Sequence, residues 1–110
     1  MIDWSRVRIL CEEVGREDFE EVVVLFFEEM DGALNRLRQS PDLLRLEGDL
    51  HFLKGSALNF GFTRFSELCE AGEGLCAHGQ AWKIELDPII LSFDRSRALF
   101  EAQYRQHMLS

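Results

Sequence analysis

Apolar residues recur at three- and four-residue steps along most of the chain, which is the spacing of amphipathic helices. The longest such stretch runs from Glu17 to about Gln39, and the acidic residues at its start suit a helix N-terminus. The run Val22–Val24 has strand propensity, but the helical period continues on both sides and outweighs it. The residues that we expect on the buried face of this helix are Phe19, Val22, Val23, Phe26, Met30, Ala33, Leu34 and Leu37.

A short helix precedes this long one, and another helix follows it. The first is expected over Asp3–Val14, with its aspartate as the cap and Gly15 as the end. The segment Ser40–Asp42 breaks the pattern, because its proline disfavours helix in the residue before it and its aspartate can cap the next helix. That third helix is expected to end near Gly61. The apolar residues on its core-facing seam are Leu43, Leu46, Leu50, Leu53, Ala57 and Phe60.

Two more helices are expected in the second half of the chain. One runs from Thr63, which can cap it, to near Gly79, although Gly72 and Gly74 each weaken it by about 1 kcal/mol relative to alanine. The pair Asp87–Pro88 supplies a cap and a first helical residue for the last helix. The apolar residues of these helices are Phe65, Leu68, Cys69, Leu75 and Cys76 in the fourth and Ile89, Ile90, Phe93, Phe100 and Tyr104 in the last.

Four substantial helices with short connections predict an all-α fold, an antiparallel four-helix bundle with the short N-terminal helix laid across one end. The 110 residues are too few for two cores of ordinary size, so we expect one domain over residues 1–110. The starting methionine and the short segments outside the bundle lead us to expect a stand-alone protein.

The composition and charge of the chain argue against several classes of function. Twenty Asp and Glu against twelve Lys and Arg give a formal charge of -8, the wrong sign for binding a nucleic-acid backbone. The N-terminus lacks a signal sequence and the longest apolar run is too short to span a membrane, so we expect a cytoplasmic protein. The three cysteines lack the spacing of a disulfide framework or a zinc site, so we expect reduced, mostly buried thiols and no metal.

The third helix carries a second face that the core does not use. At about 100° per residue, the buried seam centres roughly 130° from His51, which places His51 outside the core. Two leucines and two glycines lie close to His51 on this wheel, and each glycine costs about 1 kcal/mol in a helix. This pattern indicates that a large partner approaches the imidazole between apolar contacts. The residues expected around His51 are Leu44, Glu47, Gly48, Lys54, Gly55 and Leu58.

Lys54 and Glu47 are the charged residues of this face. Helical side chains lean toward the N-terminus, so the Lys54 ammonium is expected to bend back over the His51 ring. A compact cation beside an exposed ring nitrogen suits the neutralisation of a phosphoryl group. Glu47, one turn before His51, either orients the imidazole through a ring N–H or is an ordinary surface acid, and the sequence favours neither.

The run His51–Gly61, with HxLKGSAxxxG at its matching positions, resembles the signature of histidine-containing phosphotransfer (HPt) domains of two-component phosphorelays. The order and length of the helices are similar to the family over nearly the whole chain. Cys69 and Glu73 in the next helix also fit the family's usual pattern. Phe52 and Gly72 depart from it, because small or polar residues are common at the first position and leucine at the second.

The resemblance implies that His51 accepts a phosphoryl group from the phospho-aspartate of a receiver domain and passes it to another receiver's aspartate. It implies a monomeric carrier without kinase or ATP-binding activity and with no cofactor of its own, since the receiver brings the Mg²⁺. The expected partners are receiver domains and a hybrid or sensor histidine kinase. Lys54 then neutralises the phosphate and Gly55 gives access, while the residues expected to dock the partner are Leu44, Glu47, Gly48 and Leu58.

The same apolar face would also suit a helical adaptor that docks a signalling partner without being phosphorylated, and we keep this as the alternative function. A metal site is a weaker candidate, because Cys69, Cys76 and His78 leave a tetrahedral site one ligand short.

Overall fold

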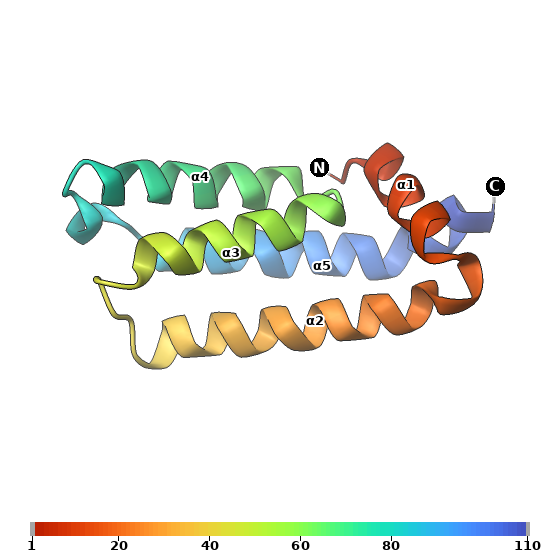
Figure 1. Cartoon of the computed structure of the whole chain (residues 1–110), viewed down its shortest axis with the longest axis horizontal. Coiled ribbons are helices and arrows are strands. Elements are labelled where there is room, and N and C mark those ends of the chain that lie inside the picture. Colours follow the sequence, from red (N-terminus) through yellow and green to blue (C-terminus); the bar gives the residue numbers. More distant parts are fainter. Residues whose placement is uncertain (1, 110) are drawn as a thin grey trace.

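Five α-helices account for most of residues 2–109, the part of the chain that this computed structural model describes. Figure 1 shows α2 to α5 side by side and alternating in direction along the long axis, with α1 packed across the end of the bundle that also holds the C-terminus. The predicted all-α bundle with an extra N-terminal helix is confirmed. The helices are α1 (Trp4–Val14), α2 (Arg16–Gln39), α3 (Leu46–Asn59), α4 (Thr63–Ala77) and α5 (Leu86–Leu109), with a 3-10 turn, η1 (Ala81–Lys83), before α5.

The start of the chain is fixed to the turn between α3 and α4. The side chain of Asp3 caps α1 by accepting from the Arg6 N–H at 3.3 Å, as predicted, and the Asp3 N–H donates to the Gly61 carbonyl at 2.8 Å. Ile2 and Phe62 form an isolated antiparallel bridge beside this contact. Gly61 has φ +72°, and a Cβ there would lie 2.5 Å from the Asp3 carbonyl oxygen. Glycine is therefore required at the end of α3 both for its backbone conformation and for the approach of the N-terminal segment.

Phenylalanine rings from several segments meet in the middle of the bundle. Phe26 of α2 stacks on Phe60 with ring centroids 3.9 Å apart, and Phe62 lies 5.6 Å from Phe93 of α5. Such pairs contribute about 0.5–1.5 kcal/mol each beyond the burial of their area. The predicted core residues of α2 and α5 are buried apart from Val22, which is partly buried, and Phe27 joins the core without having been predicted.

The prediction that the third helix begins directly after Asp42 is wrong. Residues 43–45 form a turn in which the Asp42 carboxylate accepts the Leu44 N–H at 3.0 Å, and α3 begins at Leu46. Leu43 is 57 % exposed and does not belong to the buried seam. The aspartate side chain satisfies a backbone donor within the turn, so the segment has an alternative to a first helical turn.

Smaller corrections apply at other helix ends. Thr63 is the first residue of α4, and Phe62 takes the cap position before it. The helix α4 ends at Ala77, and η1 was not predicted. The helix α5 begins at Leu86, so Asp87–Pro88 lies inside its first turn, where the missing N–H of proline has no helical partner to lose. None of the helices within residues 2–109 combines the length and the apolar character needed to cross a membrane.

Candidate functional site

The imidazole of His51 projects from α3 on the side opposite the buried seam. Its side chain is 72 % exposed, whereas Leu50 and Leu53 on the same helix are fully buried. This confirms the prediction that His51 faces away from the core. Its Nδ1 lies 3.1 Å from Oε2 of Glu73 on the neighbouring helix α4.

Glu73 joins His51 to a cation through its second oxygen. Oε1 of Glu73 lies 3.0 Å from Nζ of Lys54, and both side chains are about one-fifth exposed. One carboxylate therefore bridges two residues of α3 that are three positions apart. The expectation that Lys54 bends back over the His51 ring is replaced by this arrangement, in which the ammonium pairs with Glu73.

The hydrogen bond to His51 that was considered for Glu47 is made by Glu73, and Glu47 lies exposed on the surface. The role of Glu73 was missed from the sequence, although its fit to the HPt pattern pointed to it. The register between α3 and α4 brings His51 and Glu73 together. The spacing of apolar residues within either helix does not predict that register.

The charges of Glu73 and Lys54 stabilise each other. Partial burial is the largest influence on the Glu73 carboxyl and raises its pKa, but the hydrogen bonds from Lys54 and His51 outweigh it and hold the pKa below the usual 4.5. The hydrogen bond to Glu73 in turn raises the pKa of Lys54 above 10.5. Both groups are therefore charged at neutral pH.

The carboxylate determines which ring nitrogen of His51 carries the proton. An ionised carboxylate can only accept hydrogen bonds, so Nδ1 of a neutral His51 ring must hold the hydrogen and donate it to Glu73. The lone pair then belongs to Nε2, on a ring that is mostly open to solvent. The site therefore holds a neutral imidazole whose Nε2 can act as a nucleophile. The hydrogen bond from Nδ1 to the Glu73 carboxylate fixes this tautomer.

The two glycines beside His51 border open space. A Cβ added at Gly48 or at Gly55 would meet no other atom within 4 Å, so packing within the protein does not require glycine at either position. Of the two leucines predicted near them, Leu44 is 96 % exposed and Leu58 is partly buried. The surface around the imidazole is therefore free of bulk on the glycine side and apolar at the α2–α3 turn.

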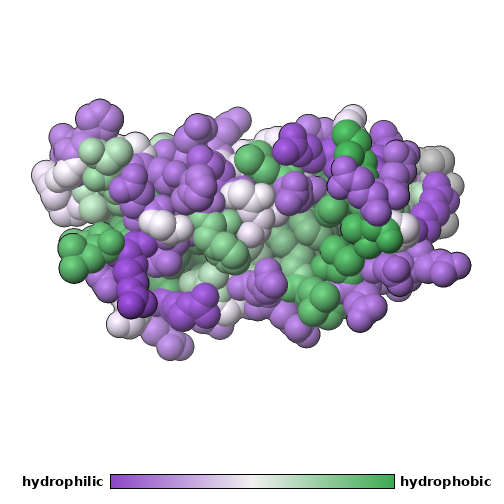
Figure 2. All heavy atoms as spheres, viewed as in Figure 1, coloured by the Kyte–Doolittle hydropathy of each residue, from purple (hydrophilic) through white to green (hydrophobic). Residues whose placement is uncertain are grey.

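The two flanks of His51 differ in character. The α4 flank holds the charged pair of Lys54 and Glu73, whereas the α2 flank mixes exposed apolar side chains with polar ones. Phe52 of α3 and Leu25 of α2 are about half exposed. A surface hollow of about 240 Å³ between α2 and α3 is lined by Leu25 and other apolar residues and also by Glu29, Ser56 and Asn59. Figure 2 shows several apolar patches on this face, separated by hydrophilic side chains, and the widest of them lies toward the end of the bundle that α1 covers.

The Cys69 thiol is a nucleophile candidate that lies near Glu73 and Lys54. Burial raises the pKa of the Cys69 thiol to about 12, with the negative charge of Glu73 adding to the effect and Lys54 opposing it, so this thiol is neutral and unreactive. Within residues 2–109, the structure gathers no three His, Cys, Asp or Glu side chains that could hold a metal ion.

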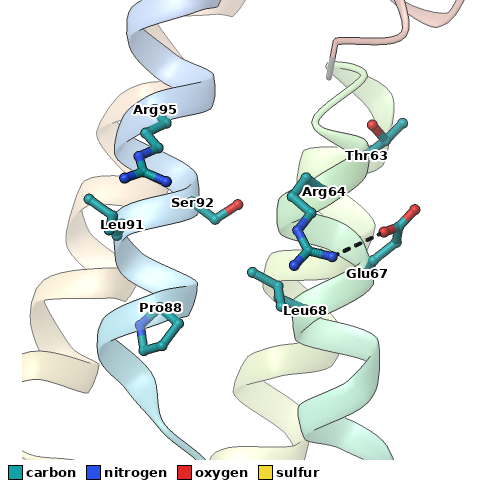
Figure 3. A pocket seen from close by; sticks show the side chains of 8 residues that line it. All are labelled: Thr63, Arg64, Glu67, Leu68, Pro88, Leu91, Ser92 and Arg95. Atoms are coloured by element: carbon teal, nitrogen blue, oxygen red, sulfur yellow. Dashed lines mark ion pairs between the residues drawn. The ribbon is translucent and has the colours of Figure 1, made fainter.

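A pocket of about 590 Å³ lies between α4 and α5, and it does not include His51, Lys54 or Glu73. Figure 3 shows Arg64 of α4 and Arg95 of α5 on its two sides, with Arg64 paired to Glu67 at 3.7 Å. Its lining includes the hydroxyl groups of Thr63 and Ser92 but no histidine or cysteine. The candidate site therefore remains the surface around His51.

The charged pair predicts how stability depends on pH. A carboxyl whose pKa is lowered by folding stabilises the folded state above its unfolded pKa of about 4.5, and this contribution disappears as the pH falls through the lowered value. Glu73→Gln should therefore lower the urea midpoint at pH 7, and the difference from the wild type should shrink toward pH 3. Glu70→Gln changes an exposed acid of the same helix and should have little effect at either pH. A Glu73→Gln deficit that is equal at pH 3 and pH 7 would contradict the ionic origin.

Comparison with known protein families identifies a match. The sequence model of the Hpt domain matches residues 21–107, which is more than three quarters of the chain. This range includes α3 and α4 entirely, and with them His51, Lys54 and Glu73. A search of curated proteins and a search of solved structures gave no match.

Proposed function

The chain belongs to the Hpt domain family, whose members carry phosphoryl groups on histidine in two-component signalling, and from this membership we propose that His51 is the phosphorylated residue. The observation that supports this choice is the hydrogen bond from His51 Nδ1 to Glu73 on an otherwise exposed ring. It leaves Nε2 free to act as a nucleophile while the ring is held in one orientation. The sequence contains two other histidines, His78 and His107.

The proposed step is an in-line exchange at phosphorus. Nε2 attacks the phosphoryl group of a receiver's phospho-aspartate, an N–P bond forms, and the P–O bond to the aspartate breaks as the carboxylate leaves. The ring keeps its Nδ1 hydrogen and gains positive charge, which the adjacent Glu73 carboxylate stabilises, as an aspartate does for histidine in a Ser-His-Asp triad. The reverse step returns the phosphoryl group to another receiver, so the chain acts as a carrier. The Mg²⁺ that neutralises the phosphate during transfer would come with the receiver.

The partner surface is proposed to lie over His51 and toward α2. The α4 flank is occupied by the Lys54–Glu73 pair, whereas the α2 flank offers open space beside Gly48 and Gly55 and the exposed ring of Phe52. The docking residues proposed from the sequence are Leu44, Glu47, Gly48 and Leu58, and the structure adds Phe52 and Leu25 as candidates on the α2 side. A receiver domain, or a hybrid kinase that carries one, is the proposed partner, and the chain is proposed to act as a monomer. The free thiols of Cys11, Cys69 and Cys76 support the cytoplasm as its location.

Lys54 is proposed to stabilise the phosphoryl group electrostatically. Its ammonium lies one turn from His51 and is held by Glu73, so it can shift toward an incoming phosphate without leaving the site. We expect Lys54→Ala to slow phosphorylation of His51 by about 10-fold, less than the 10²–10³-fold loss seen when a donor is removed from a buried site, because water screens this one. The measurement is the rate of phosphoryl transfer from a phosphorylated receiver, together with the lifetime of the phosphohistidine.

Two variants serve as controls for Lys54. Lys83→Ala removes an exposed lysine of η1 and should transfer at the normal rate, and Lys54→Arg keeps the charge and should retain most of the activity. If Lys54→Ala changes neither the transfer rate nor the phosphohistidine lifetime, Lys54 does not have this role.

A further inference from the structure

Gly72 of α4 packs directly against Leu50 of α3. It is buried, and a Cβ built on it would lie 2.7 Å from Cδ1 of Leu50, with Leu50 Cγ at 3.8 Å and Ile84 Cδ1 at 3.9 Å. Ordinary contact begins near 3.4 Å, so even a methyl group at this position would force a displacement. Leu50 is fully buried, and its side chain cannot move out into solvent to make room.

The other glycines within these two helices lack this constraint. A Cβ at Gly48, Gly55 or Gly74 would meet no other atom within 4 Å. A mid-helix glycine costs about 1 kcal/mol relative to alanine, and at Gly72 this cost accompanies a packing requirement. The sequence alone predicts only that Gly72 weakens the fourth helix, whereas α4 continues through it from Thr63 to Ala77.

The register places this contact beside the candidate site. Leu50 directly precedes His51 on α3, and Gly72 directly precedes Glu73 on α4, so the Leu50–Gly72 contact and the His51–Glu73 hydrogen bond are neighbours across the same interface. Relieving a 2.7 Å contact to 3.4 Å by moving the helices apart would take about 0.7 Å. The same movement would lengthen the 3.1 Å bond between Nδ1 and Oε2 to about 3.8 Å, which is beyond hydrogen-bond range.

We propose that Gly72 is a positioning residue for His51: the absence of a side chain at Gly72 lets α4 approach Leu50 closely enough for Glu73 to hold the imidazole in its Nδ1–H tautomer. Gly72 itself touches neither the imidazole nor the phosphoryl group. The proposal rests on the proposed function of His51 for its effect on transfer, but its effect on the tautomer can be observed without any phosphoryl group.

The test adds side-chain volume on the α4 side of the interface between α3 and α4. Gly72→Ala and Gly72→Leu are compared with the wild type by two readouts, the ¹⁵N shifts of the His51 ring and the rate of phosphorylation by phosphoramidate. This small phosphodonor needs no docking surface, so the rate reports on the imidazole itself. We expect both variants to lose the Nδ1–H preference and Gly72→Leu to react at least about 10-fold more slowly, because a misplacement of about 1 Å can cost 10²-fold.

Matched variants distinguish positioning from general damage to α4. Gly74→Ala adds a methyl group on the same helix where space is open, and it should leave the tautomer and the rate unchanged. The swap Gly72→Leu with Leu50→Ala moves the leucine from α3 to α4, and it should restore the tautomer preference and bring the rate to within a few-fold of the wild type. Leu50→Ala alone provides the reference for the swap.

The outcomes are separable. Folded Gly72 variants with a normal tautomer would overturn the proposal, whatever their rate, and so would a loss of the tautomer that the swap does not restore. Gly72→Ala decides the question if Gly72→Leu does not fold, because it adds a single methyl group. If the wild type itself is not phosphorylated on His51, the proposed function fails while the ring shifts still test the role of Gly72.

Discussion

Replacing His51 with glutamine is expected to abolish phosphorylation of this protein completely. Glutamine has a similar length and can still hydrogen bond to Glu73, but its amide nitrogen has no available lone pair with which to attack phosphorus. The fold should be unaffected, because the His51 side chain is 72 % exposed. The measurement is incubation of the purified protein with a phosphorylated receiver, followed by detection of acid-labile, alkali-stable phosphate on the chain.

The other two histidines serve as controls for this experiment. The Nδ1–H of His78 donates to the Gly74 carbonyl oxygen at 2.7 Å at the end of α4, and His107 stacks on Trp4 with ring centroids 4.0 Å apart. Replacing either with glutamine should leave phosphorylation intact. Label that persists after His51→Gln would refute the assignment of His51.

The same variant separates the carrier from the alternative adaptor. An adaptor that docks its partner through the apolar surface around His51 would keep its binding and its signalling after His51→Gln. A carrier would keep its binding to the receiver and lose its signalling. Binding and signalling should therefore be measured together on this variant.

Gly55→Trp is expected to reduce phosphoryl transfer from a receiver by at least about 100-fold, because transfer requires near-contact geometry and a displacement of about 1 Å can cost that much. Gly55 is exposed and a Cβ added there would meet no atom within 4 Å, so we expect the fold to tolerate the substitution. The indole would then occupy the open space one turn from His51 through which the receiver's aspartate has to approach. The transfer rate is the measurement, and a thermal melt establishes that the variant is folded.

A second glycine provides the matched control. Gly74 of α4 is also exposed and also has no atom within 4 Å of its ideal Cβ, so Gly74→Trp adds the same bulk to the bundle at another place. Gly74→Trp should transfer at close to the normal rate. Normal transfer by Gly55→Trp would show that the glycine is not needed for access.

The spacing of apolar residues predicts the fold well, because the residues at this spacing form the buried face along which each helix packs. The seam residues Leu46, Leu50, Leu53 and Ala57 are all buried, and their spacing alone places His51 on the opposite side. The period fails at Leu43, where the Asp42 carboxylate holds a backbone N–H in a turn, since local polar groups can end a helix that the apolar spacing would continue.

The candidate site was only partly predictable from the sequence. The exposure of His51 and the open space beside Gly48 and Gly55 follow from positions on one helix, so the sequence contains them. The partnership of Glu73 with His51 and Lys54 depends on the register between α3 and α4, along an interface where Leu50 packs against the bare backbone of Gly72. The spacing of apolar residues along one helix does not reveal which residue of a neighbouring helix lies opposite a given side chain.

His51, Lys54 and Glu73 all lie on the hairpin formed by α3 and α4, so bringing them together closes only a short loop of the chain. His51 and Glu73 are 22 residues apart in sequence, whereas the Asp3–Gly61 contact that fixes the N-terminal segment spans 58 positions. Because the entropy lost on closing a loop grows with the logarithm of its length, bringing His51 and Glu73 together costs about 0.9 kcal/mol less than closing the longer loop. The functional contacts are thus among those that this chain can order with a small loss of freedom, independently of how its N-terminal helix is attached.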